Sequence, residues 1–208
     1  MKFGEMYVRF RLSEKTEIEW SQFHCGDVDL EAFFLKDAAN YERQLLGKTY
    51  CFVPKNNLST IVCAFTLSNS SIDARNLPNS RRKKMMEHIP HEKSLSSYPA
   101  TLIGRLAVSE NFQGKGIGSN LLNYIKLWIL EPENKTGCRF LTIDAYNNEA
   151  TGRFYEANGF KYLFSSEQQE KDYIGLSAEK ELRTRLMYFD LMLLDNSLLR
   201  TSLTIKSV

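Results

Sequence analysis

Residues Asn111 to Leu122 read NFQGKGIGSNLL and place Gly114, Gly116 and Gly118 at alternate positions, directly before an apolar run with helical spacing. Glycine keeps side chains away from the backbone, so successive N–H groups can converge on an anion, and a helix N-terminus adds the positive end of its dipole. This arrangement is typical of phosphate binding. The alternative is a glycine-rich turn that only joins a strand to a helix.

Two common phosphate loops are excluded by spacing. A P-loop requires Gly-x-x-x-x-Gly-Lys-Ser/Thr, whereas Lys115 lies between two glycines. A dinucleotide fingerprint requires Gly-x-Gly-x-x-Gly, and the last position holds Ser119 or Leu121, depending on which glycine begins it. The pattern that remains is Gln113-x-x-Gly116-x-Gly118. A pyrophosphate would suit such a cradle.

Hydrophobic periodicity predicts the elements that position this loop. We expect strands at 6–12, 49–53, 59–68, 101–108, 138–145, 160–165 and 183–191, and helices at 27–46, 80–88, 121–129 and 148–160. The stretch 69–99 is expected to be an irregular excursion around the short helix, and 195–208 a C-terminal tail. Residues 1–194 are therefore expected to form one mixed α/β domain.

Composition sets the bounds on function. The 208 residues suffice for one large core, with 43% hydrophobic and 25% charged residues. A net charge of +2 does not by itself imply nucleic-acid binding. The four scattered cysteines favour free thiols over a zinc site or a disulfide framework. With no secretory signal and no long apolar run, the sequence predicts a cytoplasmic protein without membrane contact.

A second motif, NNEATGRFYEANGF, follows about 30 residues after the loop. Together with IGRLAVSENFQGKGIGSNLL it resembles the GNAT superfamily of acyl-CoA-dependent N-acyltransferases. The signature Gln/Arg-x-x-Gly-x-Gly/Ala is matched by the loop, and the second element by Asn147, Ala150, Phe154-Tyr155 and Gly159-Phe160. The resemblance implies a central mixed, mostly antiparallel sheet with splayed strands 4 and 5, flanked by helices.

The resemblance also implies acetyl-CoA as co-substrate, with no metal. It implies that the cofactor-binding residues are Leu106, Ala107, Val108, Gln113, Gly114, Lys115, Gly116, Ile117, Gly118, Ser119, Asn147, Phe154 and Tyr155. The loop would bind the pyrophosphate, and the strand edge at 106–108 would bind the pantetheine. Tyr155 would direct its hydroxyl at the cofactor sulfur.

Amine acetylation from a thioester needs few protein groups. The backbone N–H of Leu106 or Val108 can stabilise the developing oxyanion, and Tyr155 can act as the acid that assists the leaving thiolate. Residue type makes Glu110, Asp144, Glu149 and His91 candidates for a general base, but the sequence fixes the position of none. An α-amine, with a pKa near 8, needs less help than a lysine amine, near 10.4.

FHCGDVDLEAFFLKDA and GRLAV add a narrower resemblance, to the acetyltransferase toxins of bacterial toxin–antitoxin pairs. It implies the amine of charged tRNA as acceptor and an antitoxin partner. The basic run Arg81 to Lys84 could add phosphate contacts. The excursion at 69–99 and the tail are longer than the toxin pattern, so a small-molecule or protein amine remains an alternative. A non-catalytic acyl-CoA sensor is a second alternative, and a homodimer is a further expectation.

Overall fold

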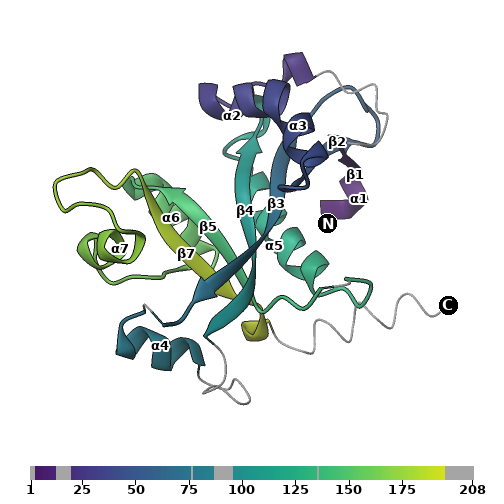
Figure 1. Ribbon diagram of the computed structural model, residues 1–208. Coiled ribbons are helices and arrows are strands. Elements are labelled where there is room, and N and C mark those ends of the chain that lie inside the picture. The colour runs from purple at the N-terminus through teal and green to yellow at the C-terminus, as the bar shows by residue number, and fades with distance from the viewer. Residues whose placement is uncertain (1–2, 13–19, 76, 87–95, 135, 195–208) are drawn as a thin grey trace. The chain divides into compact units, whose positions relative to one another are not determined.

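The computed structural model describes residues 3–12, 20–75, 77–86, 96–134 and 136–194 (Figure 1). The strands are β1 (Tyr7–Arg11), β2 (Lys48–Pro54), β3 (Cys63–Asp73), β4 (Ser97–Val108), β5 (Phe140–Tyr146), β6 (Lys161–Tyr162) and β7 (Thr184–Asp190). The helices are α1 (Phe3–Met6), α2 (Val28–Ala32), α3 (Ala38–Arg43), α4 (Asn79–Met86), α5 (Ile117–Ile129), α6 (Glu149–Ala157) and α7 (Glu167–Ile174). Short 3₁₀ turns lie at Trp20–Gln22, Glu110–Phe112 and Leu191–Leu193, and one π-helical turn at Phe33–Asp37.

The strands form one sheet in the order β1-β2-β3-β4-β5-β7-β6. The sheet is mostly antiparallel, and β4 and β5 run parallel. This confirms the expected mixed α/β architecture. The chain divides into two compact units, Met1–Asn69 with Ile103–Trp128 and Ser70–Leu102 with Ile129–Val208, and β3 and β4 contribute residues to both. The single domain expected over 1–194 stays a prediction.

In the first unit, alternation along β2 directs side chains to opposite faces of the sheet. Tyr50 and Phe52 contact the α5 rings of Trp128 and Tyr124, with centroids 4.9 and 5.0 Å apart. Cys51, between them, packs instead with the aromatic side chains of the 28–43 helical segment. In this unit, helix α5 and the helical segment 28–43 therefore cover opposite faces of the strands.

The second unit is organised around β7 in the same way. Tyr188 belongs to a buried cluster that also contains Met85 of α4 and Phe140 of β5. The next residue, Phe189, faces the other way and contacts Phe160, which follows α6, with centroids 5.6 Å apart. The helix that carries the second motif is thus seated on one face of this unit's strands.

Several expectations need correction. The strand expected at 160–165 is reduced to Lys161–Tyr162, and the polar stretch after it holds α7, which the sequence did not predict. The strand expected at 59–68 begins only at Cys63. The excursion is less irregular than expected, because β3 extends into its start and β4 begins at Ser97, with α4 between them. Residues 87–95 and the tail lie outside the described residues.

No helix among the described residues is long and apolar enough to cross a membrane.

Candidate active site

The glycine loop lies in the first unit, between β4 and α5. Gly114 and Gly116 have φ of +69° and +75°, a conformation that side chains with a Cβ rarely adopt. A Cβ added to either would meet nothing within 4 Å, so the glycines are required by the backbone and not by crowding. The motif spacing therefore reflects two left-handed positions directly before a helix.

Helix α5 begins immediately after Gly116, and its first intrahelical hydrogen bond runs from Asn120 N to Gly116 O, over 3.1 Å. The N–H groups of the first turn have no intrahelical acceptor in any α-helix. Gly116, at the capping position, has no side chain that could accept from them. This turn fits a pyrophosphate, because it presents backbone donors at the positive end of a 13-residue helix.

Gln113 and Lys115 hold the loop's shape. The Gln113 side-chain nitrogen donates to Cys25 O over 2.9 Å and to Val108 O over 3.0 Å. Lys115 Nζ donates to Asn111 O over 2.8 Å, so it folds back over the loop. Gln113 thus joins the end of β4 to a distant segment of the chain.

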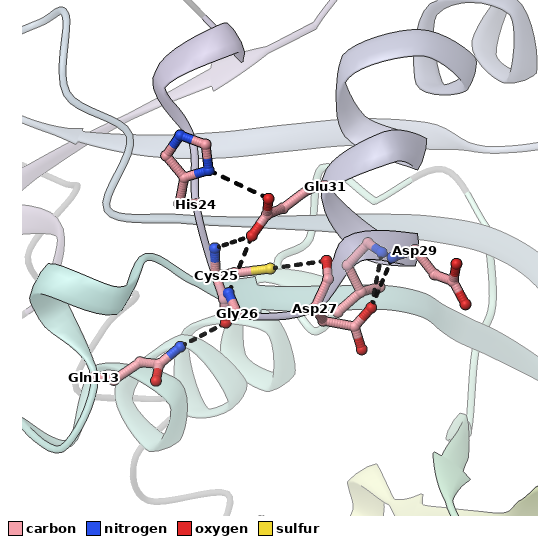
Figure 2. A network of polar contacts seen from close by, with 8 residues as sticks. His24, Cys25, Gly26, Asp27, Asp29, Glu31 and Gln113 are labelled. Atoms are coloured by element: carbon pink, nitrogen blue, oxygen red, sulfur yellow. Dashed lines mark hydrogen bonds and ion pairs between the residues drawn. The ribbon is translucent and has the colours of Figure 1, made fainter.

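The segment that Gln113 reaches is itself held by polar contacts (Figure 2). Glu31 Oε1 accepts from Cys25 N and Gly26 N, over 2.7 and 3.0 Å. These contacts lower the pKa of Glu31, the Cys25 hydrogen bond most, and His24 Nδ1, 3.2 Å from Glu31 Oε2, adds to the effect. Sequence reasoning did not single out Glu31. The available signal was a glutamate in the first turns of a helix that Asp27 already caps.

At the end of β4, Ala107 is buried in a cluster with Phe23, Phe33 and Phe34. Leu106 and Val108, on either side of it, are partly exposed. Arg105, in the GRLAV stretch, is exposed and lies over the Phe33 ring, 4.9 Å from its centroid. The first unit thus contains both the end of β4 at 106–108 and the loop 113–119; their binding of a cofactor stays a prediction.

The second unit contains the remaining predicted residues. Asn147 directly follows β5, and its side-chain nitrogen donates to Glu167 Oε1 and Leu182 O, over 3.0 and 2.8 Å. Its backbone N donates to Arg183 O over 2.9 Å. Because both hydrogens of the side-chain amide are committed, a cofactor contact by Asn147 would use its carbonyl oxygen Oδ1. That contact stays a prediction.

Tyr155 lies on α6 between Phe154 and Phe160, with ring centroids 5.0 and 5.7 Å away. Its burial raises the pKa of the hydroxyl to about 12. The hydroxyl therefore stays protonated at neutral pH and can donate a hydrogen bond. Gly152, on the same helix, allows α6 to pack closely against Tyr162. A Cβ at position 152 would lie 2.2 Å from the Tyr162 hydroxyl oxygen.

The candidate bases lie in different places. Glu110 and Asp144 are exposed, and Glu149 is exposed and pairs with Arg153 one helical turn away. His91 lies outside the described residues. Within the part of the chain that the structure describes, no group of three or more His, Cys, Asp or Glu side chains could hold a metal ion.

Residues 84–162 match the family model of the acetyltransferase (GNAT) domain. Within this range the chain is recognised as a GNAT acetyltransferase domain. The matched range includes β4, the glycine loop, α5, β5 and α6, and so contains every predicted site residue. The acetyltransferase assignment made from the two motifs is confirmed.

One curated relative and two solved structures show how far the similarity extends. The chain is 26% identical to a tRNA-acetylating toxin of Mycobacterium tuberculosis over 141 residues, which cover 67% of this chain and 76% of the relative. It superposes on AtaT complexed with acetyl-methionyl-tRNAfMet with a TM-score of 0.67, at 22% identity, covering 93% of this chain and 98% of the other. Against AtaTR bound with AcCoA the TM-score is 0.60, at 21% identity, covering 90% and 95%.

Proposed function

We propose that this acetyltransferase uses acetyl-CoA and that its acceptor is the α-amine of the amino acid carried by charged tRNA. The observation that carries the proposal is the glycine loop before α5, with two left-handed glycines, in a chain that is similar to a tRNA-acetylating toxin over two thirds of its length. The loop supports coenzyme A, and the relative supports the acceptor.

Coenzyme A offers a pyrophosphate for the first turn of α5 and an amide-containing pantetheine that would pair with the backbone of Leu106 to Val108 at the end of β4. Strand-like pairing through the backbone suits the pantetheine, because its amides alternate donors and acceptors as a peptide does. The solved AtaTR complex with AcCoA, which has this fold, supports the same co-substrate.

The transfer then needs one bond made and one broken. The neutral amine attacks the thioester carbon, the N–C bond forms, and the oxygen takes up negative charge that the N–H of Leu106 or Val108 would stabilise. The C–S bond breaks, and its electron pair leaves on the sulfur. The amine's extra proton passes to solvent. The Tyr155 hydroxyl, protonated because its pKa is about 12, would donate a hydrogen bond to the leaving thiolate.

The absence of a general base fixed by the sequence favours an acceptor amine with a low pKa, such as an α-amine. An α-amino group has a pKa near 8 and is partly neutral at physiological pH, whereas a lysine amine near 10.4 is almost wholly charged. The exposed Arg82 and Lys83 of α4 would add phosphate contacts to tRNA. The α4 helix is fixed to its unit by buried Met85 and by Arg81, which donates to Ser165 Oγ over 3.3 Å.

The proposed partners follow from the proposed acceptor. A protein that acetylates charged tRNA would stop translation, so a neutralising antitoxin is proposed, as for a toxin–antitoxin pair. A homodimer and a cytoplasmic location are proposed with it.

The test is release of free thiol from acetyl-CoA in the presence of charged tRNA, with the same tRNA after deacylation as the matched control. Turnover with charged tRNA alone supports the proposal. Equal turnover with both would show hydrolysis without transfer. Turnover only with small amines or peptides would contradict charged tRNA as the acceptor and would still support the acetyltransferase activity.

A further inference from the structure

The turn His24 to Gly26 lies between two parts of the first unit (Figure 2). On one side Glu31 of α2 accepts the N–H groups of Cys25 and Gly26. On the other side the Gln113 side-chain nitrogen donates to Cys25 O, and Glu110 N donates to His24 O over 2.9 Å. The turn is therefore hydrogen-bonded both to the N-terminal helix and to the connection that leads into the glycine loop.

The Glu31 contacts are stronger than ordinary backbone hydrogen bonds, because an ionised carboxylate accepts two N–H groups at once. The lowered pKa of Glu31 agrees with this. Removing the carboxylate would leave the N–H of the buried Cys25 without this acceptor. Gly26 has φ of +80°, and an added Cβ would lie 3.1 Å from Glu110 Oε1, so the turn has little freedom to change shape.

Capping does not explain Glu31. The helix start is capped by Asp27, whose Oδ1 accepts from Asp29 N and Leu30 N, each over 3.0 Å. Glu31 points back from the helix to the preceding turn. Its contacts therefore hold the backbone of Cys25 in place, and the carbonyl of Cys25 accepts the hydrogen bond from Gln113.

We propose that Glu31 is a positioning residue for coenzyme A. It holds the Cys25–Gly26 turn, the turn holds the Gln113 amide, and Gln113 sets the path of the loop from Gly114 to Gly118 that binds the pyrophosphate. This inference rests on the proposed use of coenzyme A. It adds a cofactor-positioning role to a helix that contributes no residue to the glycine motif.

The test is a double-mutant cycle on the full chain, with the dissociation constant of coenzyme A measured by calorimetry. Glu31→Ala and Gln113→Ala should each weaken binding about tenfold, and the double variant should be no weaker than the weaker single by more than about twofold, because the two residues act through one turn. Steady-state kinetics should show the acetyl-CoA KM raised and kcat changed less. Glu31→Gln keeps an acceptor oxygen for both N–H groups and should recover most of the affinity.

Asp27→Ala is the matched control, since it disturbs the same helix without touching Cys25 N or Gln113. It should lower the Tm and leave coenzyme A affinity unchanged. If Glu31→Ala does not fold, Gly26→Ala disturbs the same turn and should raise the acetyl-CoA KM.

Binding within twofold of wild type in a folded Glu31→Ala protein would overturn the inference, as would additive losses in the double variant or an equal loss in Asp27→Ala. A wild-type protein that does not bind coenzyme A would instead overturn the proposed function, and the inference with it.

Discussion

Gln113 Nε2 donates a hydrogen bond to Cys25 O over 2.9 Å and so joins two residues that are 88 positions apart in the sequence. The contact places the N-terminal HCGDVDLE stretch and the glycine loop in one polar network. The stretch that resembles the toxins and the glycine loop that resembles a coenzyme A site are therefore joined by hydrogen bonds.

Tyr155→Phe should reduce kcat by about a hundredfold or more, because the leaving thiolate loses its hydrogen-bond donor, while the ring and its packing remain. Coenzyme A affinity should change little. Tyr162→Phe is the matched control, since it removes another hydroxyl of the same unit and should leave kcat unchanged. Single-turnover kinetics separates the effect on the chemical step from the effect on binding. An unchanged kcat in Tyr155→Phe would exclude the acid role.

The pH profile should have one ascending limb. Burial raises the pKa of Tyr155 to about 12, above its usual value near 10, so the hydroxyl stays protonated and active until well above pH 10. The acceptor amine becomes reactive as pH rises through about 8. The rate of acetylation, measured between pH 6 and 9, should therefore rise and level off. A descending limb in this range would show that an acid other than Tyr155 is required.

Gly116→Ala should weaken coenzyme A binding about tenfold or more, because φ of +75° costs a residue with a Cβ about 1–2 kcal/mol and the loop would relax away from its left-handed form. Gly137→Ala is the control, since a Cβ at Gly137 also meets open space but its φ is not positive. Calorimetric titration with coenzyme A measures both. Equal affinities would show that the left-handed conformation at Gly116 does not matter for binding.

Gly152→Ala should lower the free energy of unfolding by about 1–3 kcal/mol, since its Cβ would lie 2.2 Å from the Tyr162 hydroxyl oxygen. Adding Tyr162→Phe should restore most of the loss, because the next atom of that ring, Cζ, would be 3.5 Å away. Urea denaturation of the two single variants and the double variant measures the coupling. Absence of rescue would place the strain elsewhere in α6.

Much of the fold could be predicted because its signals are local. The apolar stripe of α5, the Asp27 cap and the glycine pattern each occur within a few residues of the sequence, and the structure confirms the elements they predicted. The match of residues 84–162 to the acetyltransferase family confirms the activity inferred from the two motifs.

Helix α7 and the role of Glu31 could not be predicted, because each depends on contacts with residues from other parts of the chain. The buried residue of α7 is Glu170, whose carboxylate accepts from Arg185 Nε over 2.7 Å, so the helix lacks an apolar stripe. Glu31 owes its importance to the shape of a turn and to Gln113, far along the chain. Periodicity detects buried apolar faces, and it does not detect a charge whose partner comes from another element.

The most direct test of the acetyltransferase proposal is mass spectrometry of the aminoacyl end of charged tRNA after incubation with the protein and acetyl-CoA. We predict that the amino acid gains one acetyl group on its α-amine with the wild-type protein, and gains far less with Tyr155→Phe. Charged tRNA that remains unmodified, while acetyl-CoA is consumed with another amine, would contradict the proposed acceptor.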